Sequence, residues 1–262
     1  MENVKDAKKI VIKIGTSTIT HKSGNVNIRR VEELVKIISD LKNSGKEIII
    51  VSSGAVGVGA GKMGLQKRPD DIPSKQAIAA IGQCELMYLY DKLFGEYNHN
   101  VAQVLLTYSF LTNEKKITNV KNTFNKLLEF GAIPIVNEND SVSTEELEVG
   151  DNDTLSAYVS NIIGADLLIL LTDIDGLYDS NPKENVNAKK IEIVEEIDDY
   201  IISLAKSTSN SFGTGGMITK LKAGQIVSEE NINMVIMSSN NPKDLYRLFD
   251  GEDVGTLFRW KK

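Results

Sequence analysis

KIVIKIGTS, at residues 9–17, is a short run of mainly β-branched apolar residues that stops at Gly15. A run of this length that ends at a glycine indicates a buried strand. The next stretch, IRRVEELVKIISDLKNSG, has apolar residues at helical spacing, with Asn27 before it and Gly45 where a C-terminal cap is expected. A second apolar run, EIIIV at about 47–51, predicts another strand. The chain therefore starts with a strand, a helix and a strand.

The same alternation continues to the C-terminus. Four further apolar runs predict strands, at 101–106, 132–136, 166–171 and 233–237. Four helix-like stretches lie between them, near 75–95, 117–130, 153–163 and 217–229. Continuous apolar strands that alternate with helices predict an α/β fold, with helices on both faces of a mainly parallel sheet. We expect a three-layer α/β/α sandwich, formed by a single domain over 1–262 with two lobes that meet near residue 160.

Composition excludes several classes of protein. The 262 residues are 41% hydrophobic and 25% charged, which is ordinary for a globular protein. The net charge of −6 argues against a general nucleic-acid binder. No run approaches the roughly 18 apolar residues of a membrane span, and the polar N-terminus lacks a secretion signal. We therefore expect a cytoplasmic protein with no nucleic-acid or membrane partner.

Cysteine and histidine are too scarce for several kinds of site. His21 and His99 are the only histidines, which argues against a Cys/His zinc site and leaves few candidates for a Ser-His-Asp triad. Cys84 is the only cysteine, so no disulfide can form within the chain. Because Cys84 stands in a helix-like apolar run, we expect it to be a small buried hydrophobe rather than a nucleophile.

Functional side chains are expected in the loops that follow the strands, because ligands bind beyond the carboxyl ends of a parallel sheet. Lys13 interrupts the first apolar run near its end. A buried lysine is costly unless it meets an anion; alternatively, Lys13 lies at an edge and extends its ammonium group to water.

Glycines dominate the segment after the second strand. SSGAVGVGAGKMG, residues 52–64, contains a formal G-x-G-x-x-G pattern. The pattern starts several residues beyond the strand and lacks the acidic residue of a dinucleotide site at a strand end, so we reject that interpretation. A Walker A motif is also absent. We expect a flexible loop whose backbone N–H groups can line an anion.

Four later loops carry polar residues. Asn137–Asp140 and Gly150–Asp153 group short acids and amides that suit an ammonium group or a metal–phosphate complex, although each could be an Asx-capped turn. Thr172–Tyr178 lacks the distal glutamate of a calcium-binding EF-hand. Gly213–Lys220 places glycines at the start of a helix, where free N–H groups and the helix dipole favour phosphate.

Taken in order, these loops resemble the amino acid kinase family, and within it the branch that phosphorylates glutamate. The matching segments are VIKIGTS (11–17), VSSGAVGVG (51–59), KQAIAAIGQ (75–83), VNENDSV (136–142), GDNDTLSA (150–157), LLTDIDGLYDSNP (170–182) and GTGGMITKLKA (213–223). Two departures stand out. Gly57 and Val58 replace the usual alanines, and the chain ends just past GTLF (255–258), so we expect a short form without the family's C-terminal PUA domain.

The resemblance implies a role for each group of site residues. Lys13, Lys220 and Asp153 would be catalytic, with the lysines on either side of the transferred phosphoryl group and Asp153 orienting both. The glutamate site would contain Ser53, Gly54, Asp140 and Asn152, with Asp140 receiving the ammonium group. The ATP site would contain Lys13, Thr172, Asp173, Thr214, Gly215, Gly216, Met217, Ile218, Thr219 and Lys220.

The resemblance also implies the ligands and the assembly. ATP would be the co-substrate with Mg²⁺, whose protein ligands stay unassigned, and L-glutamate would be the acceptor. The lobe of about 1–160 would bind glutamate, and the lobe of about 161–262 would bind the nucleotide. Proline would act as a feedback inhibitor, and the chain would form a homo-oligomer, either a dimer or a tetramer. The alternatives are another specificity of the family (aspartate, N-acetylglutamate or carbamate) and a non-catalytic nucleotide sensor.

Overall fold

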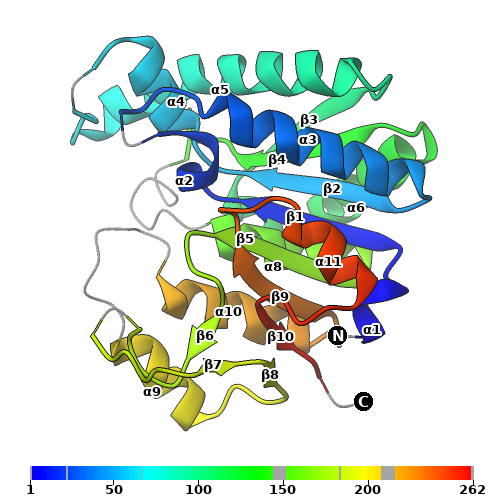
Figure 1. The fold of residues 1–262 in the computed structure, drawn as a ribbon. Coiled ribbons are helices and arrows are strands. Elements are labelled where there is room, and N and C mark those ends of the chain that lie inside the picture. Colours follow the sequence, from blue (N-terminus) through cyan, green and yellow to red (C-terminus); the bar gives the residue numbers. More distant parts are fainter. Residues whose placement is uncertain are drawn as a thin grey trace.

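The central feature of the computed structural model is an eight-stranded sheet in the order β3-β4-β2-β1-β5-β9-β10-β8 (Figure 1). The structure describes residues 2–21, 23–65, 67–143, 152–182, 184–207 and 216–260. The first six strands are parallel: β3 (Val101–Leu106), β4 (Ile133–Glu138), β2 (Glu47–Ser52), β1 (Lys9–Ile14), β5 (Leu167–Thr172) and β9 (Asn233–Ser238). β10 (Thr256–Phe258) runs antiparallel to β9 and pairs with β8 (Ile193–Val194), while β6 (Leu177–Tyr178) and β7 (Lys190–Ile191) form a separate hairpin. The expected mainly parallel sheet is confirmed.

Helices cover both faces of this sheet, which confirms the three-layer sandwich (Figure 1). One face packs against α1 (Glu2–Lys5), α3 (Ile28–Asn43), α4 (Ala55–Lys62), α5 (Ile72–Gly95) and α11 (Asp244–Asp250). The other packs against α6 (Glu114–Glu129), α8 (Asn152–Ile163), α9 (Asp199–Ser207) and α10 (Met217–Ser228). Two short helices, α2 (Thr16–Ile19) and a 3₁₀ turn at Tyr108–Thr112, follow β1 and β3. Each face therefore has its own hydrophobic core.

The alternation of β1 decides where Lys13 points. Ile10, Ile12 and Ile14 belong to the core under α3 and α5, whereas Val11 belongs to the core under α8 and α10. Because successive side chains of a strand point to opposite faces, Lys13 lies on the face that α8 and α10 cover.

The glycine-rich segment after β2 is a helix, α4, so our expectation of a flexible loop is wrong. Its N-cap, Gly54, has a φ of 104°, a conformation that glycine adopts without strain. A Cβ on Gly59 would lie 2.1 Å from the Ile78 carbonyl oxygen, and one on Gly82 would lie 1.8 Å from the Ala55 carbonyl oxygen. The glycines thus allow α4 and α5 to cross in backbone contact rather than providing flexibility.

Cys84 is exposed, which corrects the expectation that it is buried. It lies in α5, a helix with apolar residues on all sides, so the sequence does not show which side faces the core. The buried side is the one that carries Ile78, Leu86 and Tyr90. Within the described part of the chain, no helix has the length and hydropathy needed to cross a membrane.

Candidate active site

The candidate site lies at the carboxyl ends of the central strands. β1 pairs with β2 on one side and with β5 on the other, so the chain leaves β1 towards one half of the sheet and later returns to the other half. Such a change of direction is where open parallel sheets bind ligands. Lys13 is the last residue but one of β1 and therefore lies at this change of direction.

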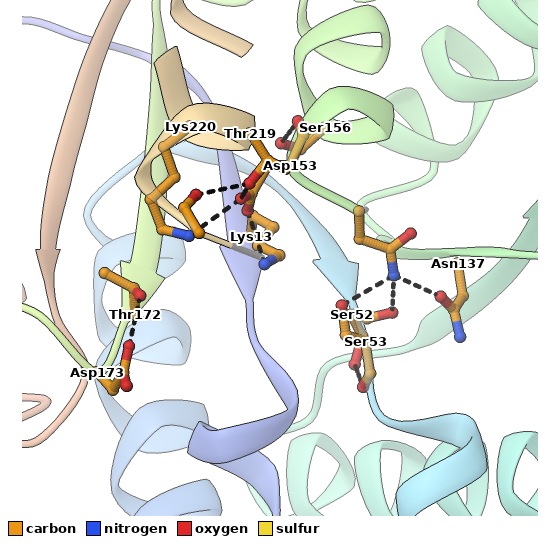
Figure 2. Close-up of polar contacts among 12 residues, drawn as sticks. Lys13, Ser52, Ser53, Asn137, Asp153, Ser156, Thr172, Asp173, Thr219 and Lys220 are labelled. Carbon is orange, nitrogen blue, oxygen red and sulfur yellow. Dashed lines mark hydrogen bonds and ion pairs between the residues drawn. The ribbon is translucent and has the colours of Figure 1, made fainter. Parts of the chain in front are cut away.

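Asp153 forms ion pairs with two lysines that are far apart in the sequence (Figure 2). Its Oδ1 atom lies 2.7 Å from the Lys13 ammonium nitrogen, and its Oδ2 atom lies 3.1 Å from that of Lys220. The Thr219 hydroxyl also donates to Oδ2, at 2.8 Å. Asp153 belongs to the first turn of α8 and Lys220 to the first turn of α10, and Asn161 Nδ2 of α8 donates to the Ile226 carbonyl further along α10.

This cluster is almost completely removed from water. Asp153 is 0% exposed, Lys220 2% and Lys13 8%. Burial by itself would raise the pKa of the Asp153 carboxyl, but the charges of Lys13 and Lys220, with hydrogen bonds from Lys13 and Thr219, lower that pKa to about 2. Asp153 is therefore ionised at neutral pH, and two ammonium groups share one carboxylate. Among the described contacts, two lysines pair with a single carboxylate, which suits an anionic ligand.

The N-terminus of α10 adds backbone donors beside these lysines. Gly216 is its N-cap, is exposed, and makes no side-chain cap hydrogen bond. The first N–H groups of a helix have no partner within the helix, and the helix dipole makes this end positive. Gly216, Met217 and Ile218 lie at this helix start, whereas Thr214 and Gly215 lie outside the described residues.

A second polar cluster surrounds Asn152. Its Nδ2 atom lies 2.9 Å from the Ser53 hydroxyl, 3.2 Å from the Ser52 carbonyl and 2.8 Å from Asn137 Oδ1 (Figure 2). Its Oδ1 atom is buried and has no hydrogen-bond partner among the described residues. The side chains of two predicted substrate residues, Ser53 and Asn152, are therefore in direct contact, beside the Gly54 cap of α4, and one acceptor remains available.

Asp140 lies just beyond β4 and is 9% exposed. Burial raises the pKa of its carboxyl to about 6. A carboxylate in this setting gains from a cationic ligand, because an ammonium group would offset the cost of its burial.

Thr172 is the last residue of β5 and Asp173 follows it, and both lie on the opposite side of Lys13 from Ser53 (Figure 2). The Thr172 hydroxyl donates to Asp173 Oδ1 at 3.1 Å. Thr172 is buried and Asp173 is exposed, so the carboxylate of Asp173 faces solvent at the strand end. Among the described residues, no group of three or more His, Cys, Asp or Glu side chains could hold a metal ion.

The structure also brings in residues that sequence reasoning did not assign. Asn137 connects Asn152 to α5, because its Nδ2 donates to Gln83 Oε1 at 2.9 Å. The Tyr90 hydroxyl lies 3.0 Å from the Ser52 hydroxyl in the core, and burial raises the pKa of Tyr90 to about 12. Asn137 stood in a polar cluster after a strand, a signal that could have found it, whereas nothing in the pattern of α5 marks Gln83 or Tyr90.

Two buried lysines, the positive end of α10 and the polar cluster around Asn152 thus follow the carboxyl ends of the central strands, an arrangement that suits an anionic ligand. The chain belongs to the amino acid kinase family, whose sequence profile matches residues 8–238. This confirms the family resemblance seen in the loops.

Curated relatives match along nearly the whole chain. A glutamate 5-kinase of Clostridium perfringens is 51% identical over 263 residues, covering 99% of this chain and 98% of that protein. A glutamate 5-kinase of Listeria monocytogenes is 48% identical, covering 100% of this chain and 96% of that protein.

Solved structures with low sequence identity share the fold. A carbamate kinase from Giardia lamblia bound to AMP-PNP superposes with a TM-score of 0.67 at 14% identity, covering 98% of this chain and 100% of that one. An isopentenyl phosphate kinase from T. acidophilum gives a TM-score of 0.64 at 16% identity, covering 96% of this chain and 100% of that one.

Proposed function

We propose that this protein is a glutamate 5-kinase, which transfers the γ-phosphoryl group of ATP to the side-chain carboxylate of L-glutamate. The product, glutamyl 5-phosphate, is the first intermediate of proline biosynthesis. The observation that carries the proposal is the buried Lys13–Asp153–Lys220 cluster. Two relatives named glutamate 5-kinase are 51% and 49% identical to this chain over nearly its whole length, which supports the choice of substrate.

The reaction joins two anions, so the enzyme must neutralise charge and align the groups. A glutamate carboxylate oxygen forms the new bond to the γ-phosphorus, the bond from phosphorus to the β,γ-bridging oxygen breaks, and ADP leaves with that electron pair. Lys13 and Lys220 would flank the transferred group and stabilise its charge. Asp153 would hold both ammonium groups in place before the substrates arrive, so that little reorganisation is needed during transfer.

The two substrates would approach from opposite lobes. The lobe of about 1–160 would bind glutamate through Ser53, Gly54, Asp140 and Asn152. The ammonium group of glutamate would donate to Asp140 and to the open Asn152 Oδ1. The lobe of about 161–262 would bind ATP through Thr172, Asp173 and the segment of Thr214–Lys220.

Mg²⁺ is part of the proposal as the partner of the ATP phosphates. It usually keeps several waters and takes one or two carboxylates plus phosphate oxygens, and the described residues fit this modest demand with the exposed Asp173 at the end of β5. When bound, Mg²⁺ would neutralise part of the phosphate charge.

A substrate panel tests the proposed function. ADP release is followed with glutamate, aspartate, N-acetylglutamate, carbamate and UMP as acceptors. We expect turnover with glutamate at least tenfold above each of the others. Turnover that is highest with another acceptor would assign another specificity of the family, and binding of ATP without turnover on any acceptor would support a nucleotide sensor instead.

Proline inhibition belongs to the same proposal. Proline shares the α-carboxylate and a cationic nitrogen with glutamate but lacks the side-chain carboxylate, so Asp140 and Asn152 would accept it without reaction. Initial rates against proline at several glutamate concentrations should show competition that raises the apparent KM for glutamate. Inhibition that does not depend on glutamate would place proline elsewhere.

We also propose a cytoplasmic homo-oligomer, a dimer or a tetramer, as the resemblance implies. Light scattering of the purified protein measures its mass directly. A mass of 28.8 kDa, that of one chain, would contradict this part of the proposal.

A further inference from the structure

Thr219 makes its strongest contact to the cluster rather than towards an open nucleotide site. Its hydroxyl lies 2.8 Å from Asp153 Oδ2 and 2.8 Å from the Gly216 carbonyl oxygen. A hydroxyl has one proton to donate, and an ionised carboxylate accepts a stronger hydrogen bond than a neutral carbonyl. The proton therefore points to Asp153.

The two carboxylate oxygens of Asp153 contact different side chains. Oδ1 holds Lys13 at 2.7 Å, whereas Oδ2 is shared between Lys220, at 3.1 Å, and the Thr219 hydroxyl. The contact from Lys220 has the geometry of a hydrogen bond, so Oδ2 receives two donors from the first turn of α10. The Thr219 hydroxyl and the Lys220 ammonium group together fix the position of Oδ2.

We infer that Thr219 is a positioning residue, which fixes the plane of the Asp153 carboxylate and thereby sets where that carboxylate holds the Lys220 ammonium group. This inference rests on the proposed function and changes the role that the family resemblance implied for Thr219, from a nucleotide contact to a partner of Asp153. Without the hydroxyl, the carboxylate would lose one of its donors and would turn, and the Lys220 ammonium group would move with it.

Two variants separate these roles. Thr219→Val removes the hydroxyl at nearly constant volume, and Thr219→Ser keeps it. Ser156→Ala is the matched control, because the Ser156 hydroxyl donates to the backbone carbonyl of Asp153, at 2.6 Å, and not to its carboxylate. Initial rates are measured against glutamate and against ATP for the wild type and the three variants.

We expect Thr219→Val to lower kcat by about 10- to 100-fold, in the range seen when a supporting residue of a site is lost, with both KM values within about threefold of the wild type. Thr219→Ser and Ser156→Ala should stay within about threefold of the wild-type kcat. An increase of the ATP KM at unchanged kcat would make Thr219 a nucleotide contact and overturn the inference, as would a wild-type kcat in Thr219→Val.

A second measurement does not need turnover on glutamate. Titration of the Asp153 carboxyl carbon by NMR should give a higher pKa in Thr219→Val than in Thr219→Ser, by up to about one unit, because the variant loses a hydrogen bond to the charged form. Equal pKa values would overturn the inference even in an active enzyme. If the pKa values differ but the wild type does not phosphorylate glutamate, the proposed function fails while the contact of Thr219 with Asp153 stands.

Discussion

Replacing Asp153 with asparagine removes the only carboxylate that touches both Lys13 and Lys220 among the described contacts. The side chains of Lys13 and Lys220 are 10% and 3% exposed, so water cannot replace the lost charge without opening the site. The amide nitrogen of the new side chain would also face an ammonium group. Because both groups are hydrogen-bond donors, this contact would be unfavourable. Removal of one partner from a buried ion pair costs about 3–5 kcal/mol, and we expect Asp153→Asn to lower the free energy of unfolding by this amount at pH 7.

Urea unfolding, followed by the fluorescence of Trp260, the single tryptophan, measures this loss. The slope of the unfolding free energy against urea should stay at the wild-type value, which shows that the same transition is compared. Asp173→Asn is the control, because Asp173 is exposed and bonds to the Thr172 hydroxyl, and it should change stability by less than about 0.5 kcal/mol.

The pH dependence of the difference in unfolding free energy between the wild type and Asp153→Asn gives an independent check. The pKa of the Asp153 carboxyl is about 2 in the folded protein against 3.8 in the unfolded chain. A lowered pKa contributes stability that is fully present above about pH 4 and is lost as the pH falls to about 2. The wild type should therefore lose about 2.5 kcal/mol of its advantage over Asp153→Asn across this window. A difference below about 1 kcal/mol at pH 7 would refute the reasoning that the carboxylate neutralises two buried lysines.

Three further changes test other parts of the molecule. Lys220→Ala should lower kcat by about 10²- to 10³-fold, as for one lost transition-state donor, with a smaller change of the glutamate KM; a kcat within a few-fold of the wild type, measured by ADP release, would contradict its role. Asp140→Asn should raise the glutamate KM far more than the ATP KM, and equal increases would point to folding instead. The same variant should unfold at higher urea than the wild type at pH 8 but not at pH 4, because burial raises the pKa of Asp140 from 3.8 to about 6, so the wild type loses stability as the pH rises between these values. Gly82→Ala should lose more than about 2 kcal/mol of stability, because its Cβ would lie 1.8 Å from the Ala55 carbonyl oxygen, whereas Gly95→Ala meets nothing within 4 Å and should not.

The order of the strands and helices followed from local patterns. The predicted run of 101–106 is β3 as observed, and the predicted stretch near 217–229 differs from α10 by one residue at its end. These elements are short apolar runs or regular helical repeats bounded by glycine or capping residues, so the information lies within each segment. The loop motifs were equally local, and they carried the family resemblance that the comparison confirmed.

Local pattern was a poor guide where packing decides conformation or exposure. The glycines of 54–61 indicate flexibility when taken alone, and they form α4 because α5 lies against them. Cys84 is exposed because α5 packs another of its apolar sides against the sheet and α4. The packing of these elements, rather than the sequence of α5, decides which side is buried.

By itself, the sequence determined the class of fold, the polar residues at the strand ends and the family, since each depends on residues that are close together along the chain. Only the tertiary structure decided which of those residues meet. Asp153 is 140 residues from Lys13 and 67 from Lys220 in the numbering, and no local signal sets which carboxylate oxygen each lysine contacts or that Thr219 shares one of them. The pairing of β1 with β5 and the packing of α10 on α8 bring these groups within hydrogen-bond distance, because sheet register and helix packing act between segments that are far apart in the sequence.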